Sequence, residues 1–97
     1  MYTTISVQHT AIAGAGQLVS RQTIYQITGF DRPNFVGDVA RAVPEQTDCR
    51  ITGLVFEGDG IRVDGQLTVL HEHDAVLADI DRQLRAIRGV VSIRQTN

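Results

Sequence analysis

The amino-acid sequence predicts one α+β domain, a four-stranded antiparallel sheet with two helices on one of its faces. Three observations predict it. Apolar side chains recur at helical spacing in residues 35–43 and 74–88, residues 61–69 alternate between apolar and polar, and glycine or proline bounds these segments. The 97 residues, 42% hydrophobic and 21% charged, have the size and composition of a single globular domain.

The first half of this domain is expected to be a strand followed by a helix. Residues 23–28 alternate as a strand does, and an apolar stripe predicts a helix over residues 34–43. Pro33 suits the first helical turn, Asp31 is placed where a carboxylate caps the first amides, and Pro44 ends the helix. Both ends of the helix are therefore marked in the sequence.

A hairpin is expected next. Residues 49–56 form its first strand, and Glu57-Gly58-Asp59-Gly60 supplies glycines for the turn. The second strand places polar side chains on one face, and its other face holds Ile61, Val63, Gly65, Leu67 and Val69. One face of this strand is therefore expected to be buried and the other exposed.

A second helix and a last strand complete the domain. The helix is expected over residues 74–88, with Asp74 as its N-cap and Gly89 beyond its C-terminus, and residues 90–94 form the strand. The order β-α-β-β-α-β predicts a ferredoxin-like sandwich, because right-handed crossovers interleave two βαβ units into one antiparallel sheet.

The N-terminal residues 1–21 lie outside this plan and are expected to form an extension or linker, with the domain itself over residues 22–97. Residues 2–8 alternate, so one expectation is an extra strand at the sheet edge. A strand exchanged with a partner and a mobile segment are the two others. The Gly/Ala-rich residues 11–16 predict a flexible connection.

Charge and composition exclude several classes of protein. The net charge is −2, and the nine basic residues, all arginine, are scattered, so we do not expect the domain to bind nucleic acid by itself. No apolar run has the length of a membrane span, and the N-terminus lacks the pattern of a secretory signal, so we expect a cytoplasmic protein without a membrane partner. The single cysteine, Cys49, excludes an intramolecular disulfide.

No arrangement of reactive side chains predicts an enzyme, a metal site or a cofactor. His71-Glu72-His73-Asp74 lacks a third ligand placed by sequence, so we expect a solvated loop that ends in a helix cap. Cys49 has no histidine placed as its base and is expected to be a small hydrophobic residue in the sheet. Gly14-Ala15-Gly16 lacks the third glycine and the βαβ context of a dinucleotide fingerprint.

The segment between the first strand and the first helix has chemistry that suits a ligand. Amides at a helix N-terminus favour a carboxylate, and Asp31 offers a partner for an ammonium group, so residues 29–34 suit a zwitterion. The competing interpretation, in which Asp31 only caps the helix and Arg32 is only a surface charge, stays open.

Two stretches resemble the ACT domain family. Ile27-Thr28-Gly29-Phe30-Asp31-Arg32-Pro33 with the apolar helix after it is similar to the family's opening strand, Gly-x-Asp-Arg-Pro-Gly turn and aliphatic helix. Leu84-Arg85-Ala86-Ile87-Arg88-Gly89-Val90-Val91-Ser92-Ile93 is similar to the family's leucine-rich helix, Ile-x-Gly-Val turn and last strand. The resemblance covers residues 22–95. The hairpin Phe56-Glu57-Gly58-Asp59-Gly60 and the strand after it look most like the C-terminal regulatory ACT domain of RelA/SpoT-type (p)ppGpp synthetase/hydrolase enzymes.

The resemblance implies an allosteric, regulatory role of the stringent-response type, without catalysis. It implies a homodimer that binds a small amino acid and controls a catalytic domain in the same or a partner chain. Carried over to this sequence, the ligand-binding residues would be Gly29, Phe30, Asp31, Arg32, Pro33, Asn34, Phe35 and Val36, with Ile51 facing them across the dimer interface.

One position departs from the family pattern. Asn34 stands where the family usually has glycine, and its side chain would intrude on the pocket, although asparagine tolerates unusual φ better than most residues. The alternative function is therefore a dimerisation or protein-interaction module of the same fold that binds no ligand. The sequence leaves open which amino acid would bind and whether the chain is part of a larger enzyme.

Overall fold

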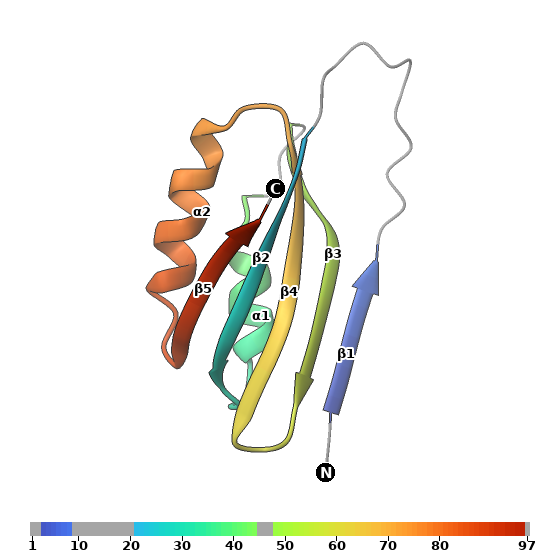
Figure 1. The fold of residues 1–97 in the computed structure, drawn as a ribbon, viewed down its shortest axis with the longest axis vertical. Coiled ribbons are helices and arrows are strands. Elements are labelled where there is room, and N and C mark those ends of the chain that lie inside the picture. Colours follow the sequence, from blue (N-terminus) through green and yellow to red (C-terminus); the bar gives the residue numbers. More distant parts are fainter. Residues whose placement is uncertain (1–2, 9–20, 45–47, 97) are drawn as a thin grey trace.

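The computed structural model describes residues 3–8, 21–44 and 48–96, and it shows one antiparallel sheet with two helices (Figure 1). In chain order the elements are β1 Thr3–Gln8, β2 Arg21–Phe30, α1 Phe35–Arg41, β3 Cys49–Gly58, β4 Arg62–His71, α2 Ala75–Arg85 and β5 Val90–Thr96. The strands lie in the order β1-β3-β4-β2-β5. Without β1 this is the ferredoxin-like βαββαβ topology, so the predicted fold class is confirmed.

β1 adds a strand to the predicted sheet. It pairs antiparallel with β3, from Thr3 opposite Gly58 to Gln8 opposite Gly53. Of the three expectations for the N-terminal extension, the added edge strand is therefore confirmed. The predicted flexible connection at residues 11–16, which contains Gly14-Ala15-Gly16, lies outside the described residues. β1 and β5 are therefore the two edge strands of the sheet.

The central strand β2 is longer than predicted at both ends. Its residues 21–30 all pair with β4, and Gly29 and Phe30 stay in the ladder opposite Val63 and Arg62. Tyr25 and Ile27 point into the core and are almost completely buried. Cross-strand pairing thus continues through residues whose local pattern predicts a turn.

A β-bulge shifts the buried face of β3. Residues Cys49 and Ile51 are buried before it, whereas Leu54 and Phe56 are buried after it. The register against β4 shifts between Ile51 and Gly53, so Thr52 is the additional residue. The apolar side chains before and after the bulge therefore point into the same core, although they are not an even number of residues apart.

The hairpin turn differs from the prediction on both sides. Glu57 and Gly58, predicted as turn residues, belong to β3 and pair with Asp64 and Val63 of β4. We predicted that Ile61 lies on the buried face of the third strand, but it belongs to the turn and is exposed. The carboxylate of Asp59 accepts hydrogen bonds from the amides of Arg62 and Ile61 at 2.8 and 2.9 Å, which holds the turn through residue 61. These amide bonds, that of Arg62 first, hold the pKa of Asp59 below its ordinary value.

Both helices cover the same face of the sheet. The ring of Phe35 in α1 lies over Gly29 of β2, where an added Cβ would come within 2.7 Å of it. The hydroxyl of Tyr25, also on β2, donates to the carbonyl of Leu77 in α2 at 3.4 Å. Residues four apart on a strand point to the same face, so Gly29 and Tyr25 place α1 and α2 on one side.

The helices pack through the apolar stripes that the sequence predicts. α2 buries Ile80 and Leu84 completely, and α1 buries Phe35 and Val39. The Phe35 ring meets the ring of Phe56 on β3 edge to face, with centroids 6.1 Å apart. This contact joins α1 to the hairpin half of the sheet.

Gly65→Ala should destabilise the protein by about 1–3 kcal/mol, because an added Cβ would lie 2.3 Å from the Phe56 ring and 2.4 Å from the Val55 carbonyl oxygen. Gly37→Ala in α1 is the matched control, since its Cβ would meet nothing closer than 3.8 Å and alanine favours a helix. Urea unfolding followed by circular dichroism measures both. Equal midpoints for the two variants would contradict the packing described for Phe56.

Candidate functional site

The loop of residues 29–34, for which the sequence predicts a ligand, is held between two other turns. The amide of Phe30 donates to the carbonyl of Gly89, in the turn between α2 and β5, at 2.9 Å. The amide of Asp31 donates to the carbonyl of Ile61, in the β3–β4 hairpin, also at 2.9 Å. Three segments far apart in the sequence therefore meet at this end of the sheet.

The side chain of Asp31 binds the hairpin and does not cap α1. Its Oδ2 accepts a hydrogen bond from the amide of Gly60 at 2.9 Å. The carboxylate lies above Gly58, where an added Cβ would come within 2.5 Å of Oδ2. The predicted cap is wrong, because α1 begins after Asn34 and receives no side-chain cap bond. Strand pairing brings the hairpin amide to the carboxylate, which local sequence does not reveal.

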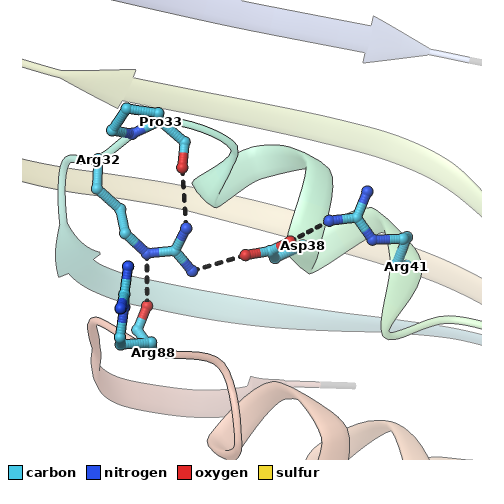
Figure 2. A network of polar contacts seen from close by, with 5 residues as sticks. All are labelled: Arg32, Pro33, Asp38, Arg41 and Arg88. Atoms are coloured by element: carbon cyan, nitrogen blue, oxygen red, sulfur yellow. Dashed lines mark hydrogen bonds and ion pairs between the residues drawn. The ribbon is translucent and has the colours of Figure 1, made fainter.

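Arg32 connects the loop to α1 and to the turn that follows α2 (Figure 2). Its Nε donates to the carbonyl of Arg88 at 2.9 Å, Nη1 to the carbonyl of Pro33 at 2.9 Å, and Nη2 to Oδ2 of Asp38 at 2.7 Å. The guanidinium carbon lies 5.7 Å from the centre of the Phe35 ring, and the side chain is 20% exposed. Arg32 is thus a structural cross-link, and the interpretation of it as a surface charge is wrong.

The carboxylate of Asp38 is shared by two arginines. Its other oxygen is bound by Arg41, one turn later on α1. The hydrogen bond from Arg32, strengthened by the charges of both guanidinium groups, holds the pKa of Asp38 below its ordinary value.

Asn34 adopts a left-handed backbone conformation. Its φ is 67°, in the left-handed region, where asparagine is tolerated better than most residues. The chain can therefore make the turn into α1 without glycine, as expected. The prediction that Pro33 lies in the first helical turn is wrong, because α1 begins at Phe35 and Pro33 precedes its N-cap residue Asn34.

Two surface hollows flank the loop and have opposite character. The apolar hollow has a volume of about 500 Å³ and is lined by Thr28, Gly29, Phe30, Ile61, Arg62, Val91 and Ser92. Three of its side chains are unusually exposed for large apolar residues, Phe30 at 60%, Ile61 at 75% and Val91 at 62%. The basic hollow, on the helix side, has a volume of about 510 Å³ and is lined by Arg32, Asp38, Arg41, Ala42, Gln83, Ala86, Ile87 and Arg88.

The structure divides the predicted ligand-binding residues between these places. Gly29 and Phe30 line the apolar hollow, and Arg32 lines the basic one. Phe35 is buried and Val36 packs partly against the core. Ile51 is buried on β3 opposite Val69, several residues along the sheet from the loop, so its contact across an interface stays a prediction.

Sequence reasoning missed Val91 and the pair Asp38 and Arg88 as parts of these hollows. Val91 is the second residue after Gly89 and lies at the irregularity in the pairing of β5 with β2. An apolar side chain at this position in the predicted last strand is a usable signal. Arg88 had no signal, because only tertiary packing brings its carbonyl to Arg32. Asp38 lies six residues after Arg32, and the turn at Asn34 that brings the two together is not evident from the sequence pattern.

The predicted solvated loop at His71-Glu72-His73-Asp74 is partly wrong. His71 is the last residue of β4, paired with Arg21 on one side and Cys49 on the other, and it is 1% exposed. Its Nε2 lies 2.8 Å from Oγ1 of Thr23. Asp74 stands at the N-cap of α2 but makes no cap bond, since its carboxylate binds Arg21 at 2.7 Å.

The remaining residue candidates give no further site. Cys49 is buried in the sheet, as predicted. Among residues 3–8, 21–44 and 48–96, no three His, Cys, Asp or Glu side chains come together in the way that a metal ion requires. Within the same residues, neither helix has the length and apolar content needed to cross a bilayer.

Comparison with known proteins shows the fold. No family model matches the chain, and no curated protein matches its sequence. The crystal structure of the ACT domain from the GTP pyrophosphokinase of Chlorobium tepidum matches with a TM-score of 0.68 and 15% identity, over 80% of this chain and 100% of that one. The solution NMR structure of that ACT domain matches with a TM-score of 0.64 and 15% identity, over 80% of this chain and 88% of that one. The resemblance that the sequence suggested is thus confirmed as a structural match, and the chain has the fold of that ACT domain.

Arg32→Gln should lower the free energy of unfolding by about 1–2 kcal/mol at neutral pH, because it removes bonds to the Arg88 carbonyl and to Asp38. Arg94→Gln, on the exposed strand β5, is the control for loss of a positive charge. Urea unfolding of both variants measures the difference. A loss of similar size in the control would contradict the cross-link.

The stabilisation from Asp38 should also depend on pH. Because its pKa is lowered in the folded state, the contribution is complete above the unfolded value of about 3.9 and is lost as the pH falls through the folded pKa. Wild type should therefore lose more stability than Arg32→Gln between pH 7 and about pH 2.5. Denaturant midpoints at the two pH values measure this, and a constant difference between the proteins would contradict it.

Proposed function

We propose that this chain is a regulatory, non-catalytic module of the ACT type that dimerises through the β5 edge and binds a small aliphatic amino acid in the apolar hollow. The observation that carries the proposal is the cluster of Phe30, Ile61 and Val91, three exposed apolar side chains from three different elements. Exposed apolar clusters of this kind mark interaction surfaces, because an isolated domain gains nothing by leaving them in water.

The position of the cluster supports a dimer at the β5 edge. Val91 belongs to β5, an edge strand whose outer backbone groups can pair with another strand. β1 occupies the edge of β3 from Gly53 to Gly58, so sheet extension on that side would require β1 to be displaced. A second copy that pairs along β5 would cover Val91 and approach Phe30 on the neighbouring strand.

The rim of the apolar hollow has the charges that an amino acid needs. Arg62 lines the hollow and pairs with Asp64, with 3.1 Å between Nε and Oδ2. Asp64 also accepts a hydrogen bond from Thr28 at 2.7 Å. A ligand carboxylate would bind Arg62, its ammonium group would bind Asp64, and its aliphatic side chain would contact Phe30 and Ile61. The ligand would then lie beside Gly29 and Phe30, with residues 31–36 supporting the loop from behind.

In this role the module would act in the cytoplasm and transmit ligand binding to a catalytic domain in the same or a partner chain. Residues 29–34 contact both the hairpin and the α2–β5 turn, so a ligand against Phe30 would act on three segments at once.

A second candidate, a dimerisation module without a ligand, is favoured by one observation. Asp31 and Arg32, the charged residues of the predicted ligand loop, already have partners within the chain in Gly60, Arg88 and Asp38. A ligand that needed those two side chains would have to break these bonds. The two candidates share the interface and differ in the amino-acid site.

Val91→Asp should weaken self-association at least about tenfold, because it places a carboxylate in the apolar contact. Val55→Asp is the matched control, since Val55 is also an exposed valine on the outer face, but it lies on β3 outside the hollow. Sedimentation velocity across a range of protein concentrations measures both. A monomeric wild type, or equal weakening by both variants, would contradict the β5 interface.

Valine, leucine and isoleucine should produce saturable amide shifts in β2, the hairpin and β5, measured by NMR, and Arg62→Gln should weaken binding about tenfold. Arg50→Gln, an exposed arginine on β3, is the control. If a dimer forms but no common amino acid shifts residues 28–31, 61–64 and 90–92, the module without a ligand is the correct function.

A further inference from the structure

The basic hollow on the helix side carries more positive charge than the surrounding structure neutralises. Its lining contains the guanidinium groups of Arg32, Arg41 and Arg88 and a single carboxylate, that of Asp38. Both oxygens of Asp38 are already used, one by Arg32 and the other by Arg41. No carboxylate in the described part of the chain pairs with the side chain of Arg88.

The excess of two positive charges is local and contrasts with the molecule as a whole, whose net charge is −2. The negative end of the α2 dipole accounts for an arginine close to the helix C-terminus, such as Arg88. The negative end of the α1 dipole accounts in the same way for Arg41, in the last turn of α1, but no helix C-terminus of its own accounts for Arg32, which comes from the β2–α1 loop. Three cations from three segments thus converge on one hollow.

The arginines retain donors for a further partner. A guanidinium group has five N–H donors. Arg32 uses one N–H on each of its three nitrogens, toward the Arg88 carbonyl, the Pro33 carbonyl and Asp38, as Figure 2 shows. Because Arg32 is held by three bonds and is mostly buried, part of the binding surface is already ordered before any ligand arrives.

We propose that this hollow binds a small phosphate ester, with the phosphate held by Arg41, Arg88 and the remaining donors of Arg32. A phosphate monoester carries a charge of about −1.5 to −2 at neutral pH, which matches the local excess, whereas a carboxylate would neutralise half of it. Guanidinium groups bind phosphate through paired N–H donors, and arginine is the residue best suited to this geometry.

The rest of the hollow suits the organic part of such a ligand. A volume of about 510 Å³ is much more than a phosphate group fills. Ala42, Ala86 and Ile87 provide a short apolar floor, and the amide of Gln83 is a neutral hydrogen-bonding group beside it. These features fit a phosphorylated small molecule better than an inorganic anion.

The basic hollow and the proposed amino-acid site are separate places on the surface, and Arg32 belongs to the loop that lies between them. The basic hollow lies among the helices, whereas Phe30 and Arg62 of the apolar hollow lie on the outer face of the sheet. A phosphate bound to the remaining donors of Arg32 would act on the same guanidinium group that joins the β2–α1 loop to the Arg88 carbonyl and to Asp38. A ligand in the basic hollow would thereby affect the conformation of residues 29–34.

Titration of the full chain with pyrophosphate, followed by NMR at constant ionic strength, tests the proposal. We expect saturable amide shifts at the end of α1 and in residues 83–89, and a Kd at least about tenfold weaker for Arg88→Gln and for Arg41→Gln. Both side chains are exposed, so these variants should fold, and the dispersion of their spectra verifies it. Arg94→Gln, which removes the same charge on β5, should bind like wild type.

Three results would overturn the proposal. One is the absence of saturable shifts up to millimolar pyrophosphate when sodium chloride of equal ionic strength is the reference. Another is equal weakening by Arg94→Gln and Arg88→Gln, which would indicate unspecific charge attraction. The third is equal affinity for acetate, which would assign the hollow to carboxylates. None of these depends on dimerisation or amino-acid binding, so the outcome is separable from that of the proposed function.

Discussion

The arrangement at the functional end of this domain depends on the guanidinium group of Arg32. It joins the β2–α1 loop to the Arg88 carbonyl beyond α2 and to Asp38 on α1, while its face lies over the Phe35 ring. An α1 of seven residues is too short to be stable by itself. Its position is therefore set by the core contact of Phe35 and by the Arg32 bonds, and the loop conformation follows from both.

Asp31 has the corresponding role on the other side of the loop. By accepting the Gly60 amide it ties the hairpin to the strand that precedes α1, in the space left by the missing side chain of Gly58. Asp31 thus holds the loop to the β3–β4 hairpin, whereas Arg32 holds it to α1 and to the turn after α2. This explains why the loop can present Phe30 to solvent on the sheet side and Arg32 to a basic hollow on the helix side.

A large part of the fold could be predicted from periodicity. The stripe of Ile80 and Leu84 on α2 and the alternation of Val63, Leu67 and Val69 on β4 are properties of residues close in sequence, and the structure buries all of them. The segments for which local pattern failed are Ile61, which the Asp59 turn removes from its strand, and His71, which pairing on both sides draws into the sheet. At Ile61 a local turn, held by a carboxylate two residues away, outweighed the alternation, whereas at His71 pairing with distant segments did.

The sequence by itself determined the order of helices and strands, the apolar faces that form the core, and the turn at residues 29–34 that resembles the ACT family. These depend on spacing, on proline and glycine, and on burial, which act over a few residues. The tertiary structure decided what the charged residues of that turn do, because the Gly60 amide and the Arg88 carbonyl reach them only after the sheet has formed. The Asp38 carboxylate reaches Arg32 once the chain has turned into α1. It also decided that Phe30, Ile61 and Val91 share one hollow and that three arginines share another, since no local spacing relates these residues.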